Sequence, residues 1–251
     1  MRRPARIVAG AVLLASACAA ASAAELRVLS AGAMRAGLIA AAPAFRESGG
    51  HTITTEFAIA SELRRRVAGG EAADVLLAPL DVIDALTKAG RLVGEGQVAA
   101  GRVGAGVVVR NGAPLPDISS AEALKRSLLA AERVVYNRAS SGVYIETMLK
   151  KLGVYDELGA RLIRYDDGTA VMNHLIKGQG REFGFGGVTD ILLYRDKGLQ
   201  LVGPLPEEIQ NYTAYAAAMV AATVNRDAAI VFLRFLASPE GKALFDANGI
   251  R

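Results

Sequence analysis

The chain has very little of the cysteine and histidine from which zinc centres and disulfide-stabilised folds are built. It contains one cysteine, two histidines and no tryptophan among 251 residues. A single cysteine excludes a disulfide within the chain, and no Cys/His cluster has the spacing of a zinc site. EF-hand and P-loop patterns are missing as well. We therefore expect neither a metal nor a cofactor.

Signatures of catalysis are equally scarce. His51 begins a predicted strand, and His174 lies inside a predicted helix. There is no Gly-x-Ser-x-Gly elbow, and no local pattern supports a Ser-His-Asp set. The sequence thus predicts a protein that is not an enzyme.

Positive charge is too sparse to indicate a nucleic-acid partner. The formal net charge is +4, and three of the arginines lie within the first six residues, inside a predicted signal peptide, which leaves +1 for the rest. Nucleic-acid binding normally needs a concentrated basic surface. A hydrophobic content of 52% excludes a disordered chain.

The N-terminal residues 1–24 have the organisation of a secretory signal peptide. A basic start precedes the apolar stretch Ile7–Ala20, and the small residues Ala21–Ala23 follow as a cleavage site. The stretch is shorter than the roughly 20 residues of a membrane span, so we expect a soluble periplasmic protein. Residues 14–18 loosely resemble a lipobox, and a lipid anchor at Cys18 is the less favoured alternative to cleavage.

After the signal, short apolar runs alternate with helical patterns. Runs such as Leu26–Leu29, Asp74–Leu77 and Val134–Tyr136 are typical of buried strands. The βαβ alternation predicts mainly parallel sheets with helices on both faces. The length favours an α/β protein of two doubly wound lobes joined by a hinge over a single sheet. We assign residues 25–103 and 218–251 to lobe 1 and residues 104–217 to lobe 2.

Four predicted strand-to-helix turns are small, hydroxylic and rich in glycine. They are Ser30–Ala33, Ala58–Ser61, Ala139–Gly142 and Asp167–Ala170. Ligands of such sheets bind where strands end and helices begin, and a helix start offers unpaired N–H groups and the positive end of its dipole. Several starts facing one cleft make an anion site. The alternative is that each Ser, Thr or Asp only caps its own helix.

These turns carry a resemblance to the periplasmic molybdate-binding proteins of ABC transporters. It covers essentially the whole chain after the signal, in order, and the Ala-Asp-Val-Leu strand after a Gly-Glu-Ala turn is its sharpest piece. The matching stretches are Ser30–Met34, Phe57–Leu63, Gly70–Leu76, Ser141–Tyr144, Lys151–Leu158, Phe183–Gly186 and Pro239–Phe245.

The resemblance implies a type II periplasmic binding protein, a monomer that closes two lobes on a small anion and delivers it to a cognate ABC permease. The family holds its oxyanion with two serine hydroxyls, a tyrosine hydroxyl and backbone N–H groups. By position the serines fall on Ala33 and Ala60, the tyrosine falls on Gly187, and the backbone donors fall near Ser141 and Gly168. All three side-chain donors are therefore replaced.

This departure favours a different anion. A hydrogen bond to a charged group contributes about 1.5–3 kcal/mol, so losing three weakens oxyanion binding unless neighbouring hydroxyls replace them. Glycine in place of tyrosine also enlarges the cleft. We expect a small organic di- or tricarboxylate, with Arg138 pairing one carboxylate. Molybdate, tungstate or sulfate is the alternative ligand, and a sensor or adhesion module is the alternative role.

The candidate ligand-binding residues are taken from the four turns, their flanks and the tyrosine position. They are Ser30, Gly32, Ala33, Met34, Ala60, Ser61, Arg138, Ser140, Ser141, Gly168, Thr169 and Gly187.

Overall fold

The fold comes from a computed structural model that describes residues 23–251. The predicted signal peptide, residues 1–24, and Cys18 within it fall almost wholly outside the described residues. Among residues 23–251, no helix combines the length and the apolar character that crossing a membrane requires.

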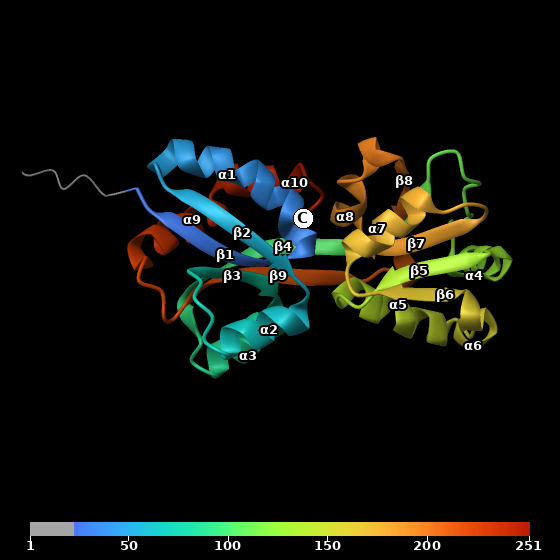
Figure 1. The fold of residues 1–251 in the computed structure, drawn as a ribbon, viewed down its shortest axis with the longest axis horizontal. Coiled ribbons are helices and arrows are strands. Elements are labelled where there is room, and N and C mark those ends of the chain that lie inside the picture. The colour runs from blue at the N-terminus through green and yellow to red at the C-terminus, as the bar shows by residue number, and fades with distance from the viewer. Residues whose placement is uncertain (1–22) are drawn as a thin grey trace, which may run out of the picture.

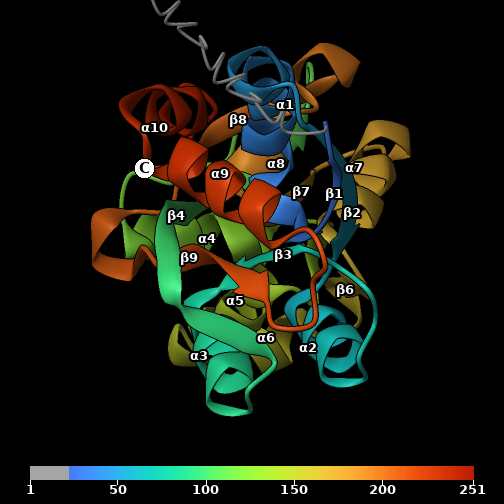
Figure 2. The same cartoon turned by 90° about the vertical axis from the view of Figure 1, so that its left-hand side faces the viewer.

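Lobe 1 is a five-stranded sheet covered by helices on both faces. Its strand order is β2 (Thr52–Ala58), β1 (Glu25–Ala31), β3 (Val75–Pro79), β9 (Tyr212–Val220) and β4 (Leu92–Arg110). One face carries α1 (Arg35–Gly49), α9 (Arg226–Ala237) and α10 (Pro239–Asp246), and the other carries α2 (Ala60–Ala68) and α3 (Leu80–Lys88) (Figures 1 and 2). The short 3₁₀ turn η1 (Gly32–Met34) joins β1 to α1.

Lobe 2 is built around the far half of β4. Its strand order is β4, β7 (Glu182–Gly187), β5 (Arg133–Asn137) and β6 (Leu162–Tyr165), and β8 (Leu199–Pro204) also pairs with β4. Its helices are α4 (Ala121–Ala130), α5 (Ser140–Lys151), α6 (Tyr155–Leu158), α7 (Gly168–Lys177) and α8 (Val188–Leu192). The 3₁₀ turns are η2 (Gly159–Arg161), η3 (Arg195–Lys197) and η4 (Glu207–Ile209).

The central strands of lobe 2, β5, β7 and the far half of β4, bury both of their faces, which explains their continuous apolar runs. Val107 and Val109 pack in a core with α4, α5 and α6, whereas Val108 packs in a second core with α7 and α8. Successive side chains point to opposite faces of a sheet, so one strand supplies both cores. Helices on both faces require this pattern.

Two long strands join the lobes (Figure 1). On β4, Val103 belongs to the core of lobe 1 and Ala105 to a core of lobe 2. On β9, the residues from Tyr215 onward pack in lobe 1, because β9 pairs with β3 from Pro79↔Tyr215 to Val75↔Met219. The second crossing therefore precedes Tyr215 and does not lie at the predicted boundary 217/218.

The predicted two-lobed α/β fold is confirmed, with one correction to the sheets. β1 pairs in parallel with β2 and β3, and β5 pairs in parallel with β6 and β7, as expected. Each pairing of β4 and β9 is antiparallel. The first half of β4, before Val103, has no continuous apolar run, and it is irregular: Gly96 and Gly101 adopt positive φ and the register with β9 shifts there.

The start of α5 lies directly against the end of β5. A Cβ atom added to Gly142 would lie 1.8 Å from the carbonyl oxygen of Asn137 and 2.7 Å from its side-chain Oδ1. Asn137 is fully buried. Glycine therefore sets how closely this helix start approaches the strand, and with it the position of Ser140 and Ser141.

We predict that Gly142→Ala destabilises the protein. An extra methyl in a packed site costs about 1–3 kcal/mol, and for a chain of this size about 1 kcal/mol lowers Tm by about 2–4 °C. Gly32→Ala is the matched control, because a Cβ atom there meets nothing within 4 Å. Thermal unfolding followed by circular dichroism measures both, and equal Tm values would contradict the close approach.

Candidate functional site

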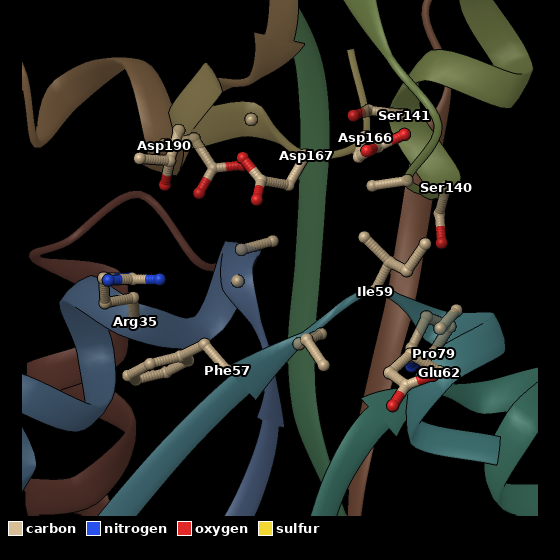
Figure 3. A pocket seen from close by; sticks show the side chains of 18 of the residues that line it. Arg35, Phe57, Ile59, Glu62, Pro79, Ser140, Ser141, Asp166, Asp167 and Asp190 are labelled. Atoms are coloured by element: carbon tan, nitrogen blue, oxygen red, sulfur yellow. The ribbon is translucent and has the colours of Figure 1, made fainter. Parts of the chain in front are cut away.

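A cavity of about 300 Å³ lies between the two lobes. The turn after β1, the starts of α2 and α3, the starts of α5 and α7, and α8 line it (Figure 3). Each of these elements follows the carboxyl end of a strand, which is where α/β sheets bind ligands. The four predicted turns therefore meet in one cavity.

Seven of the twelve candidate residues line this cavity. They are Gly32, Ala33, Ala60, Ser140, Ser141, Gly168 and Thr169. Their small side chains leave the backbone of the helix starts open to a ligand. Ala33 and Ala60 present methyl groups where the molybdate-binding proteins are expected to present hydroxyls.

The other five candidates do not line the cavity. Ser30 is fully buried in β1, where its hydroxyl donates to the carbonyl of Ala31, and Met34 is fully buried in the core of lobe 1. Ser61 faces solvent from α2. Gly187 is buried at the end of β7, where an added Cβ atom would meet Val103. Strand and helix geometry turns these side chains away from the cleft.

Arg138 is also absent from the cavity lining. Its Nε lies 3.2 Å from Asp166 Oδ1, and both side chains are largely exposed. The prediction that Arg138 pairs a ligand carboxylate is therefore not supported by its position, since a carboxylate of the protein already occupies it.

Side-chain capping accounts for only one of the four predicted turns that line the cavity. Asp167 caps α7, because its Oδ1 accepts from the N–H of Ala170 at 2.8 Å. The residues before η1, α2 and α5 make no side-chain cap. Unpaired N–H groups at a helix start need an acceptor. The starts of α2 and α5 and the turn at η1 can therefore receive an anion.

Arg35, the first residue of α1, supplies positive charge to the cavity. Its guanidinium carbon lies 4.3 Å from the centre of the Phe57 ring. Within residues 23–251 it forms no ion pair, in contrast to Arg138 and Arg65. A guanidinium held by cation–π stacking keeps its N–H fork for a planar anion. Arg35 thus places in the cavity a guanidinium of the kind that we had predicted Arg138 to supply.

The cavity also contains carboxylates, and most of them already have partners. Asp166 pairs with Arg138, Glu62 accepts two hydrogen bonds from Arg65, and Asp167 caps α7. The Arg65 guanidinium lowers the pKa of Glu62. Each of these three carboxyl groups is therefore already engaged by a group of the protein.

Asp190 on α8 differs from the other carboxylates. It opens onto the cavity and is otherwise enclosed by protein, and burial raises its pKa to about 6 against the opposing effect of Arg35. Figure 3 shows Asp190 and Asp167 on one side of the cavity facing Arg35 on the other. Burial, together with the charge of Asp190, also raises the pKa of the Tyr215 phenol.

Asn137 contributes an unused donor beneath the cavity. Its Oδ1 accepts from the N–H of Ala139 at 2.8 Å, while its buried Nδ2 has no partner among residues 23–251. A Cβ atom added to Gly168 would lie 3.8 Å from this Nδ2 and 3.1 Å from Asp190 Oδ2. The amide and the carboxyl of Asp190 therefore lie close to the same helix start.

Three residues that set the charge of the cavity, Arg35, Asp190 and Tyr215, were not among the candidates predicted from sequence. Small residues at the turns signalled the site, but Arg35, Asp190 and Tyr215 lie beyond the turns in elements of ordinary composition. Their approach depends on how the lobes meet: Thr189 of α8 donates to the carbonyl of Ala33 at 2.8 Å. Within the described residues, no group of three or more His, Cys, Asp or Glu side chains is placed to hold a metal.

Comparisons with known proteins agree with this architecture. The solved periplasmic molybdate-binding protein of Azotobacter vinelandii superposes with a TM-score of 0.77 at 17% identity, covering 90% of this chain and 98% of that one. The sulfate-binding protein of Mycobacterium tuberculosis superposes at 0.73 with 19% identity, covering 91% and 86%. At such identities the likeness shows the fold.

Two sequence comparisons go further. An aconitate isomerase from a Pseudomonas species is 30% identical over 254 residues, which cover 96% of this chain and 94% of that protein. Residues 26–251 match the family model described as bacterial extracellular solute-binding protein. The chain therefore belongs to the family of bacterial extracellular solute-binding proteins.

Proposed function

We propose that this protein is a periplasmic carrier that binds a small organic di- or tricarboxylate between its lobes and delivers it, as a monomer, to an ABC permease. The observation that carries the proposal is the guanidinium of Arg35, which is stacked on Phe57 without an ionic partner in the described chain. It faces helix starts that have no side-chain caps. Both groups recognise carboxylates.

The lining argues for an organic anion over a tetrahedral oxyanion. Ala33 and Ala60 present methyl groups, and Gly187 does not reach the cavity. At these positions apolar surface beside Phe57 and Pro79 replaces the hydroxyls that would enclose an oxyanion, and the Ser and Thr hydroxyls of the lining come from Ser140, Ser141 and Thr169 of lobe 2. A ligand with a carbon skeleton gains from contact with such a surface.

The size of the site supports more than one carboxylate. A second cavity of about 220 Å³ shares Arg35, Gly168, Thr169 and Asp190 with the first and also reaches Lys197. A carboxylate at the helix starts and a second one beside Arg35 or Lys197 would occupy both cavities. Aconitate, from which the 30% identical relative takes its name, is a tricarboxylate of this kind.

A second candidate function is isomerisation of the same ligand. The full-length match to an aconitate isomerase favours it, and so does the enclosed carboxyl of Asp190 in the cleft. The expectation from sequence that the protein is not an enzyme stays a prediction. The two functions differ in one observable, namely whether the ligand leaves the cleft chemically changed.

We predict that calorimetric titration shows binding of trans-aconitate, cis-aconitate or citrate and not of molybdate. The panel of ligands also includes tungstate and sulfate. Monocarboxylates serve as the control that tests whether a second carboxylate on the ligand is needed for binding. Tight binding of molybdate without binding of any polycarboxylate would contradict the proposal.

We predict that Arg35→Gln weakens polycarboxylate binding by about 10- to 150-fold. A hydrogen bond to a charged group contributes about 1.5–3 kcal/mol, and about 1.4 kcal/mol is a factor of ten in Kd. Arg46→Gln, at the exposed end of the same helix, is the matched control. If both variants keep the affinity of the wild type, Arg35 does not hold the ligand.

We predict that Ala60→Leu reduces the affinity while leaving Tm unchanged within a few degrees. Ala60 lines the cavity at the first residue of α2, so a larger side chain there takes up ligand space. Ala68→Leu, at the exposed end of that helix, controls for the change of residue type. Calorimetry and thermal unfolding separate a blocked cleft from a damaged fold.

A further inference from the structure

We infer that Asp190 is the acid–base residue of this cleft and that it moves a proton between two carbons of a bound unsaturated polycarboxylate. The inference rests on the proposed ligand class and adds a chemical step to it. It assigns the step to one side chain on α8, a helix that the sequence analysis had left without a role.

The position of Asp190 is the first argument. It lines both the main cavity and the side cavity, so a ligand that spans the two passes this carboxyl. Its Oδ2 lies close to the start of α7, since a Cβ atom added to Gly168 would be 3.1 Å away. The carboxyl of Asp190 therefore lies where the two cavities adjoin, beside the part of such a ligand that connects them.

The freedom of the carboxyl is the second argument. Asp166, Asp167 and Glu62 are each engaged by an arginine or by a backbone N–H. The pKa of Asp190 responds to enclosure by protein, to the charge of Arg35 and to the charge of Asp167, and no hydrogen bond from the described residues contributes to its shift. A carboxylate without a hydrogen-bond partner keeps its lone pairs for a proton of the ligand.

The groups that face Asp190 come from four elements. Arg35 on α1 attracts the carboxylate form, and Asp167 at the start of α7 repels it. Lys197 on η3 lies in the same side cavity, and Tyr215 on β9 lines the main cavity with a phenol whose pKa is raised. Enclosure outweighs Arg35, and the pKa of about 6 leaves Asp190 mostly ionised at neutral pH. Acid–base catalysts are most effective when their pKa lies near the working pH.

The step balances within the ligand and the carboxyl. In an unsaturated tricarboxylate such as aconitate, Asp190 takes a proton from the methylene carbon, and the electron pair spreads over the allylic carbons and their carboxylates. The neutral carboxyl then returns the proton to the former alkene carbon. One C–H bond breaks, another forms and the double bond moves by one carbon, so no oxidant or reductant is needed.

The other groups of the cleft stabilise the charge that develops. The intermediate carries one more negative charge than the ligand, spread over its carboxylates. Arg35 and the uncapped starts of α2 and α5 donate to those carboxylates in a cavity between two lobes. Fixed donors in an enclosed site stabilise developing charge more strongly than water does.

The experiment follows the ligand by proton NMR in D₂O. Wild-type protein is mixed with trans-aconitate, and the spectra report loss of the methylene signal by deuterium exchange and the appearance of the cis isomer. Calorimetry on the same samples measures binding. Asp190→Asn keeps the size of the side chain but cannot accept the proton, and Asp156→Asn, on the exposed surface of α6, is the matched control.

We expect wild type and Asp156→Asn to exchange and isomerise the ligand. Asp190→Asn should still bind the ligand, but its rates of exchange and isomerisation should be about 10²- to 10⁴-fold lower. Asp190→Glu should recover part of the rate. The wild-type kcat/KM should rise with pH and level off above about 6, because only the ionised carboxyl accepts a proton.

The ways in which this inference can fail are distinguishable. Absence of polycarboxylate binding by wild type would overturn the proposed ligand and this inference together. Binding with neither deuterium exchange nor isomerisation would leave the carrier role intact and overturn the proton transfer. Exchange that survives in Asp190→Asn, with the fold checked by Tm, would overturn the assignment to this residue.

Discussion

The whole site depends on the two strands that cross between the lobes. β4 contributes to the sheets of both lobes. β9 runs antiparallel to β4 and pairs with it from Tyr212 and Thr213, near the crossing, to Val220 in lobe 1. Because these two strands connect the lobes, the carboxyl ends of β1 and β2 in lobe 1 face those of β5 and β6 in lobe 2. Helices follow those ends directly, so their starts point into one cavity without any charged residue having to arrange them.

This arrangement explains which parts of the site could be predicted from the sequence and which could not. Turn chemistry is local, so small and hydroxylic residues predicted the four helix starts, and the absence of side-chain caps at α2 and α5 decided what those starts offer. The orientation of each side chain is a property of the strand or helix: Ser30 and Met34 lie in the core although they flank the first turn. Arg35 and Asp190 face each other across the cavity because α8 packs against η1 and α1, and an arrangement of residues so distant in sequence leaves no pattern in composition.

The electrostatics of the cleft indicate how the proposed anion site tolerates four carboxylates. Asp166 and Glu62 are paired with arginines, and the carboxylate of Asp167 caps the start of α7 by accepting a backbone hydrogen bond. Arg35 alone keeps an unpaired positive charge among the described residues of the lining. A carboxylate that is already hydrogen-bonded repels a ligand less than a free one does, so the balance at the centre of the site rests on Asp190 and its proton.

The charge of Asp190 also suggests how one architecture can serve both a binding protein and an enzyme. Carriage needs an enclosed cavity that holds the anion more tightly when the lobes close, and proton transfer needs the same enclosure with one reactive group in it. Replacing hydroxyls by Ala33 and Ala60 removes donors that would fix a compact oxyanion, and it leaves room for a carbon skeleton beside Asp190. Once a C–H bond lies against a carboxyl with a pKa near 6, the step from holding a ligand to changing it requires no new element of the fold.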